Sequence, residues 1–123
     1  MTNLTLTPDT LVLDLGRADR LLSLHLRSTL SVPLTSITDA HVDDEARVDW
    51  KRALKAPGTH VPGVVAAGTF YEEGRRVFAN LREGQPALVL RLRGEHYDEI
   101  VVRTDDVHAD LARVLAAIEE VNA

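Results

Sequence analysis

Apolar residues recur at about every second position through most of the chain before residue 103, in short runs separated by turn-forming residues. A period of two residues is that of a β-strand with one buried face. The segments predicted as strands are Leu4–Thr7, Leu11–Leu15, Leu22–Leu26, Ile37–Val42, Val64–Phe70, Val77–Asn80, Ala87–Leu92 and Ile100–Val102. The segments Pro8–Thr10 and Tyr71–Arg76 are typical of hairpin turns, because Pro, Gly and Asp favour chain reversal. Regular hairpins at this spacing predict a β-barrel or β-sandwich.

The last stretch of the chain changes its period from that of a strand to that of a helix. The apolar positions at spacings of i, i+4, i+7, i+8 and i+11 are Val107, Leu111, Val114, Leu115 and Ile118. The polar positions on the other face are His108, Asp110, Arg113 and Glu119. Asp105 and Asp106 stand at the start, where a carboxylate can cap free N–H groups and meet the positive end of the helix dipole. The pattern predicts one amphipathic helix that covers or plugs the sheet.

A segment in the middle of the chain, Asp43–Lys55, breaks the strand rhythm. Its acidic start suits the first turn of a helix, and basic residues follow at spacings of four. We therefore predict a short helix or helical turn that ends before Pro57, because proline disfavours α geometry in the residue that precedes it. The next segment, Pro57–Gly63, contains two Pro-Gly pairs and predicts an ordered loop.

Composition places the chain among globular proteins and narrows the classes of function. The 123 residues suffice for one domain over 1–123 with a buried core, and 4% aromatic content means that the core is aliphatic. The net charge of −5 counts against nucleic-acid binding, which needs clustered cations. The absence of cysteine excludes disulfides and Cys-based zinc sites. We expect a cytoplasmic protein, because no secretory signal or apolar run of roughly 20 residues is present.

Three stretches of the sequence resemble a known family. They are Leu30–Ile37, with an apolar-Pro-Leu-x-x-Ile step, the Pro- and Gly-rich block Pro57–Phe70, and the run Pro86–Val102 that leads to the helix. In these stretches the chain resembles bacterial pleckstrin-homology-like (PH-like) domains of the small single-domain type. The resemblance implies a mainly β fold, a PH-like antiparallel barrel or sandwich of about seven strands capped by one C-terminal amphipathic α-helix. Such folds bind lipid headgroups, peptides or each other, so the fold alone does not decide the function.

No catalytic or metal site can be recognised in the sequence. There is no Gly-x-Ser-x-Gly turn and no glycine-rich phosphate loop. The segments His41–Asp44 and His108–Asp110 each offer an imidazole and a carboxylate, but neither supplies a third and fourth ligand. The turn carboxylates are interpreted as surface charge, since no apolar setting for one of them can be inferred. This set is Glu72, Glu73, Glu95 and Asp98. We predict a protein that is not an enzyme and binds no cofactor.

The best candidate for a binding site surrounds the single tryptophan. Its residues are Arg47, Trp50, Lys51, Arg52, Lys55 and His60. A lone Trp among cations can dock an anionic peptide or insert at a membrane interface. The alternative is that Trp50 packs under the neighbouring loop while the charges remain solvated.

These observations predict a non-enzymatic interaction module that binds protein partners or self-associates as a homo-oligomer. Strand edges must be paired, blocked or charged, and the candidate edges are the strand at Pro33 and the strand Ile37–Val42, with a bulge near Asp39. The rival hypothesis is a small-molecule or lipid-headgroup binding protein, or a small enzyme, that uses Pro57–Gly63 with the side chains of His60, Tyr71 and Arg75. Headgroup binding through the first hairpin turn is disfavoured because that turn carries no cation. A third hypothesis is peripheral membrane association through Trp50, although the net charge counts against a strongly anionic membrane.

Overall fold

A computed structural model of the chain describes residues 2–15, 29–45, 53–61, 65–72, 74–82 and 84–123. The described strands are β1 (Thr2–Leu6), β2 (Thr10–Leu15), β3 (Thr29–Pro33), β4 (Ile37–Asp43), β5 (Ala53–Val61), β6 (Val65–Glu72), β7 (Arg75–Arg82), β8 (Ala87–Leu92) and β9 (Glu99–Val102). A 3-10 helix, η1 (Leu34–Ser36), joins β3 to β4, and the helix α2 (Val107–Val121) follows β9. The predicted mainly β fold with a C-terminal helix is therefore confirmed.

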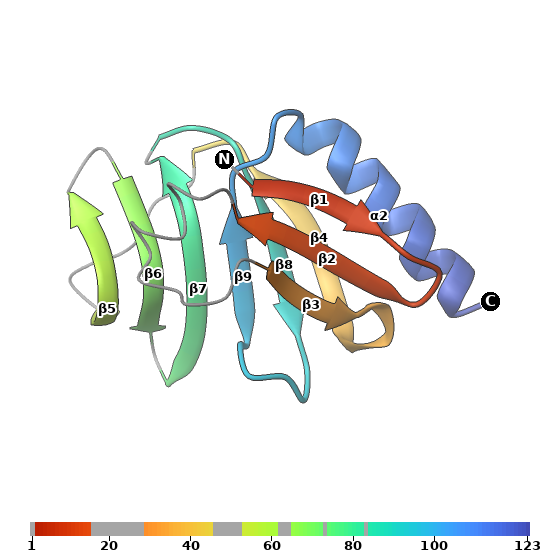
Figure 1. The fold of residues 1–123 in the computed structure, drawn as a ribbon, viewed down its shortest axis with the longest axis horizontal. Helices are drawn as coiled ribbons and strands as arrows, with labels where there is room; N and C mark the ends of the chain where they lie inside the picture. Colours follow the sequence, from red (N-terminus) through yellow and green to blue (C-terminus); the bar gives the residue numbers. More distant parts are fainter. Residues whose placement is uncertain (1, 16–28, 46–52, 62–64, 73, 83) are drawn as a thin grey trace.

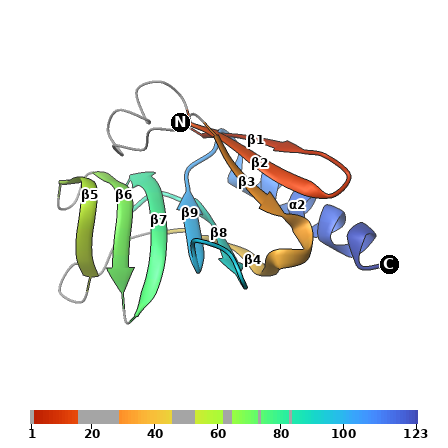
Figure 2. The same ribbon diagram turned by 60° about the horizontal axis from the view of Figure 1, so that its bottom comes forward.

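The strands form two sheets that face one another in a sandwich-like arrangement. One sheet has three strands in the order β1-β2-β3, and the other has six strands in the order β4-β8-β9-β7-β6-β5. The three-stranded sheet lies over the β4–β8–β9 part of the larger sheet, and β7, β6 and β5 extend beyond it (Figures 1 and 2). Within the described residues neither sheet closes on itself, because β1 and β3 bound one and β4 and β5 bound the other. No closed barrel is therefore present in this part of the chain.

One strand pairing departs from the predicted antiparallel arrangement. The strand β9 pairs in parallel with β7, with Val77 opposite Glu99, and in antiparallel fashion with β8. It therefore lies between β7 and β8, which follow each other along the chain. Ile100, Val101 and Val102 are consecutive and all buried, and a strand that is apolar on both faces belongs in the interior of a sheet. The purely antiparallel prediction is wrong at this pairing for that reason.

The main core fills the space between the two sheets. Leu11 and Leu13 of β2 meet Leu88 and Leu90 of β8 in a cluster to which α2 contributes Val114. All five side chains are fully buried. A second buried cluster lies on the other face of the larger sheet, because alternate residues of a strand point to opposite faces. Its members are Val77, Ala79, Leu81, Ala87, Val89 and Val101. The strand β8 is therefore buried on both faces, with Leu88, Leu90 and Leu92 on the face towards the main core.

The helix α2 packs against β4, β8, η1 and β1, on the side of the sandwich where β1 and β4 are the edges (Figure 1). Its predicted cap is confirmed, since the side chain of Asp106 accepts a hydrogen bond from the backbone N–H of Ala109 at 3.1 Å. Val107 and Val114 are buried, but Leu115 is 47% exposed. The predicted apolar stripe is wrong at Leu115, because the observed stripe continues through Ala117 and Val121, and Leu115 lies at its flank.

Two predictions for the middle of the chain are corrected. Asp43 ends β4 and Ala53–Val61 forms the edge strand β5, so a helix over Asp43–Lys55 is wrong at both of its ends. The predicted loop Pro57–Gly63 is wrong for its first five residues, which also belong to β5. Proline is tolerated there because β5 is an edge strand with a register shift between Lys55 and Gly58. Residues 46–52 and 62–64, and the predicted strand Leu22–Leu26, lie outside the described residues.

The predicted edges agree with the structure, but the predicted turn Tyr71–Arg76 is too long, because its first two and last two residues belong to β6 and β7. The strand β3, which ends at Pro33, and the strand β4 are both edge strands, and the register of β4 shifts between Ile37 and Asp39. The first hairpin turn is closed by a hydrogen bond from the Thr7 N–H to the Thr10 carbonyl at 2.9 Å. The edge of β3 is thus placed where another chain could pair with it, whereas α2 packs beside the edge strand β4.

Candidate functional site

The predicted binding cluster around Trp50 falls largely outside the described residues. This applies to Arg47, Trp50, Lys51 and Arg52. Lys55 and His60 stand on the edge strand β5, on either side of its register shift. The cluster therefore stays a prediction.

The residues that were predicted to hold a small ligand beside His60 are engaged elsewhere. Tyr71 and Arg75 belong to the hairpin of β6 and β7. The guanidinium Nη1 of Arg75 donates to the Glu99 carboxylate at 2.9 Å, and the guanidinium of Arg76 lies 5.8 Å from the centre of the Tyr71 ring. Neither Tyr71 nor Arg75 lines either of the two pockets described below.

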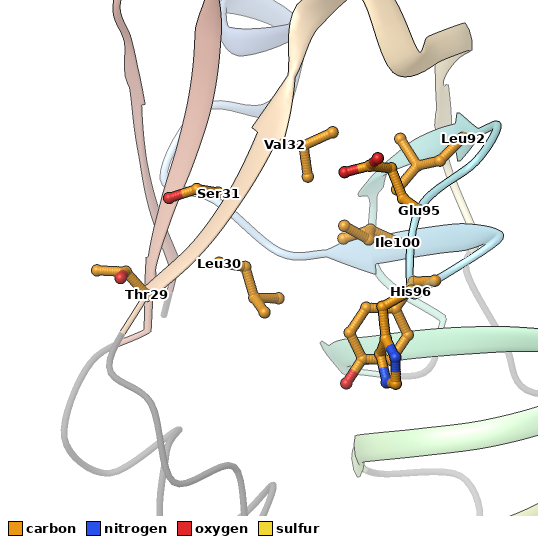
Figure 3. A pocket seen from close by; sticks show the side chains of 9 residues that line it. Thr29, Leu30, Ser31, Val32, Leu92, Glu95, His96 and Ile100 are labelled. Carbon is orange, nitrogen blue, oxygen red and sulfur yellow. The ribbon is translucent and has the colours of Figure 1, made fainter.

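A pocket of about 560 Å³ opens between the edge strand β3 and the turn that joins β8 to β9 (Figure 3). Its lining residues are Thr29, Leu30, Ser31, Val32, Leu92, Glu95, His96, Tyr97 and Ile100. This volume lies within the range of pockets that hold small ligands or side chains of a partner. The mixture of aliphatic walls and a few polar groups makes it the candidate site.

One wall of the pocket consists of four consecutive residues of β3, from Thr29 to Val32. Leu30 and Val32 point towards Ile100, whereas Thr29 and Ser31 point away (Figure 3). Because consecutive residues of a strand face opposite sides, a pocket that touches all four follows the edge of the strand. The pocket therefore runs along the edge of β3.

The edge of β3 presents backbone groups that its own sheet does not use. In the described part of the chain β3 pairs with β2 alone. The Leu34 N–H donates to the Asp9 carbonyl at 2.9 Å, which makes these two residues a hydrogen-bonded pair. Such pairs occur at every second residue of antiparallel strands, so the backbone groups of Val32 and Leu30 also point towards β2. The backbone N–H and C=O groups of Thr29 and Ser31 consequently point away from β2.

The opposite wall carries two aromatic rings that are held in place. Tyr97 is 9% exposed, its hydroxyl lies 3.2 Å from the Thr69 hydroxyl, and its ring meets Phe78 at 5.5 Å between centroids. The His96 ring stands edge-on to Tyr97 with centroids 4.7 Å apart. Arg76 Nη1 lies 3.1 Å from His96 Nδ1 and donates to the His96 carbonyl at 3.0 Å. Since a guanidinium only donates, Nδ1 is the acceptor and the neutral ring carries its hydrogen on Nε2.

Glu95 is the charged residue of the pocket. Its side chain is half-buried, and its carboxylate extends towards β3 in the direction of Val32 (Figure 3). In the described part of the chain Glu95 has no hydrogen-bond or ion-pair partner. The sequence predicted a surface carboxylate, because nothing in the turn Gly94–Tyr97 indicates that β3 lies opposite.

A smaller pocket of about 250 Å³ lies beside the start of α2, with Arg103 and Asp105 among its lining residues. Thr104 also lines it, and its buried hydroxyl has no partner among the described residues. Because Asp105 lines the pocket together with Arg103, the charges at this pocket are mixed and do not single out an anion. We assign it no function.

In each of the two His–carboxylate segments, the histidine pairs with a carboxylate outside its own segment. His41 Nδ1 lies 2.8 Å from the Asp39 carboxylate, and His108 Nε2 lies 3.6 Å from the Asp44 carboxylate. In the part of the chain that the structure describes, no three side chains of His, Asp or Glu gather as metal ligands would. The described histidines therefore offer no metal centre to build on.

Comparison of the chain with family models, with curated proteins and with solved structures finds no match. Among the described residues, α2 and η1 are each too short or too polar to cross a bilayer as a helix. The functional argument therefore begins from the pocket beside β3.

Proposed function

We propose that this protein is a non-enzymatic interaction module that binds an extended peptide segment of a partner protein along the edge of β3. The observation that supports the proposal is that an edge strand with outward backbone groups forms one wall of the pocket. An extended peptide adds to such an edge as a further strand, and its backbone pairs with the outward N–H and C=O groups.

The pocket supplies the specificity that backbone pairing lacks. In a peptide strand beside β3, every second side chain points to the face that Leu30 and Val32 share. Those side chains would enter the space bounded by Leu92 and Ile100 and bury apolar surface there. Backbone pairing gives affinity of about 0.5–1.5 kcal/mol for each hydrogen bond, and the pocket selects the side chain.

The test uses a displayed library of random ten-residue peptides, selected on the purified protein, followed by two variants at one position. Ser31→Pro removes an outward N–H, which an edge strand tolerates, and Ser31→Ala keeps it. We expect Ser31→Pro to weaken the selected peptide roughly tenfold and Ser31→Ala to leave it unchanged, by titration calorimetry. Unchanged thermal midpoints confirm that both variants fold. Equal affinities, or a library from which nothing is enriched, would refute the proposal.

A small-molecule binding protein is the second candidate function, favoured by the volume and the aliphatic lining of the same pocket. A thermal-shift screen against metabolites, anionic lipid headgroups and divalent metals separates the two, because a ligand that binds only the folded state raises the midpoint. A metabolite that shifts the midpoint equally in the parent and in Ser31→Pro would establish this second function in place of peptide binding.

Self-association is the form of the proposal in which the partner is a second copy of the chain. Light scattering over a wide concentration range tests it. A molecular mass that rises with concentration in the parent but not in Ser31→Pro would mean that the partner is a second copy of the chain. The PH-like resemblance stays a prediction. The mainly β fold with a terminal helix is compatible with it, and the parallel pairing of β7 with β9 departs from a purely antiparallel PH-like barrel.

A further inference from the structure

We infer that the pocket beside β3 selects a lysine or arginine side chain of the bound segment, with Glu95 as its counter-charge. The inference rests on the proposed peptide binding and adds the chemistry of the partner to it.

The first argument is the state of the Glu95 carboxylate. It is half-buried at the pocket and has no partner in the described part of the chain. A carboxylate without a partner at the mouth of a pocket is free to accept hydrogen bonds from an ammonium or guanidinium group that enters the pocket. A charge-assisted hydrogen bond to such a group is about twice as strong as a neutral one.

The second argument is the nature of the surrounding walls. The ring of Tyr97 lines the same pocket beside His96, and the electron-rich face of a tyrosine ring attracts a cation. The aliphatic residues opposite them suit the hydrocarbon stem of Lys or Arg, which packs on apolar surface while its head remains polar. These aliphatic residues are Leu30, Val32, Leu92 and Ile100.

The third argument disfavours an acidic partner. Among the described residues, Arg76 contacts this wall, and its Nη1 is engaged by the carbonyl and the ring of His96. Arg76 is not among the lining residues, whereas Glu95 is. An anionic side chain that entered the pocket would therefore meet a carboxylate first and would be repelled.

The experiment uses the peptide selected on the parent protein and resynthesised with each basic residue changed in turn to Gln. One Lys→Gln or Arg→Gln change is expected to weaken binding roughly tenfold or more, because a charge-assisted contact is lost. Glu95→Gln should weaken the unmodified peptide by a similar factor and leave the Gln peptide unaffected. Glu119→Gln, on the exposed face of α2, is the matched control and should change nothing.

The outcomes separate this inference from the proposal on which it rests. If Ser31→Pro weakens binding while Glu95→Gln and the Gln peptides do not, the peptide module stands and the cationic selectivity is refuted. If a free amine such as agmatine displaces the peptide and binds as tightly as the peptide does, the ligand of the pocket is a small cation and the peptide module is refuted. Charge reversal by Glu95→Lys should favour peptides with Glu at the same position, and the opposite result would also refute the inference.

Discussion

At the scale of a single residue, Gly74 determines the backbone geometry of the turn between β6 and β7. The register pairs Glu72 of β6 with Arg75 of β7, so the hairpin closes within two residues. Gly74 has a φ of 78°, in the left-handed region that a β-carbon disfavours. A β-carbon built at this glycine meets nothing within 4 Å, so the cost of replacing it is conformational rather than steric.

Gly74→Ala is therefore expected to lower the free energy of unfolding by about 1 kcal/mol. Gly74→Asn should lose less, because asparagine tolerates the left-handed region better than alanine. Urea unfolding followed by circular dichroism measures both. Equal stability of the alanine variant and the parent would show that the turn rearranges.

Glu95 shows where prediction from sequence stops at the scale of a residue. The turn that contains it was correctly expected between two strong strands. Its half-burial depends on β3, which is distant along the chain, and no local pattern encodes that contact. A carboxylate in a turn is ordinarily solvated, so only the packing of one sheet over the other gives it a different environment.

At the scale of an element, the spacing of apolar residues predicted the helix α2 but not the full extent of its buried face. The spacing predicted the helix and its cap, because both depend on residues within a few turns of one another. The pattern could not show how wide the buried stripe is, since that depends on the shape of the surface formed by β4, β8, η1 and β1. Leu115 was placed in the stripe although it faces largely outwards.

Neighbouring substitutions in α2 should therefore differ strongly in their effect on stability. Val114 is fully buried, so Val114→Ala is expected to lower the free energy of unfolding by roughly 2–3 kcal/mol through lost burial and a residual cavity. Leu115→Ala removes a larger side chain, but its exposure limits the loss to below about 1 kcal/mol. Urea midpoints compare the two. A greater loss at Leu115 would mean that its outer face is covered in solution.

The strand β5 was missed for a different reason. Two Pro-Gly pairs normally indicate a loop, and that interpretation holds for an isolated segment. At the edge of a sheet, however, a proline needs only a position whose N–H would not have been bonded, and a register shift supplies one. The identity of the element thus depends on its place in the sheet.

In the whole molecule, backbone amides are expected to be best protected from hydrogen exchange where both faces of the larger sheet are buried. The strands β8 and β9 lie inside that sheet, and their residues belong to the clusters on its two faces. Hydrogen exchange followed by mass spectrometry should therefore find their amides to be the slowest, and those at the edges of β3 and β5 to be faster. Faster exchange in β9 than in β3 would contradict this arrangement.

The overall class could be predicted from the sequence, but the order of strands could not. Alternation and turn residues are local, and they gave the strands and the terminal helix correctly over most of the described chain. Which strands become neighbours depends on long-range burial, as the apolar run Ile100–Val102 shows by entering the sheet between β7 and β8. For the same reason, the pocket between β3 and the β8–β9 turn had no local signature.

The position of β9 also has a consequence for folding kinetics. Strands β7 and β8 are joined by a short turn that contains Gly84, so they can meet early as a hairpin, yet β9 separates them in the native sheet. That hairpin would be a kinetic trap, because it occupies the edges that β9 needs. We expect the productive route to pair β8 with β9 first, through the local turn closed by the Leu92 N–H and the Asp98 carbonyl, and then to dock β9 against β7. The native order of strands therefore predicts a competition during folding between two hairpins that share β8.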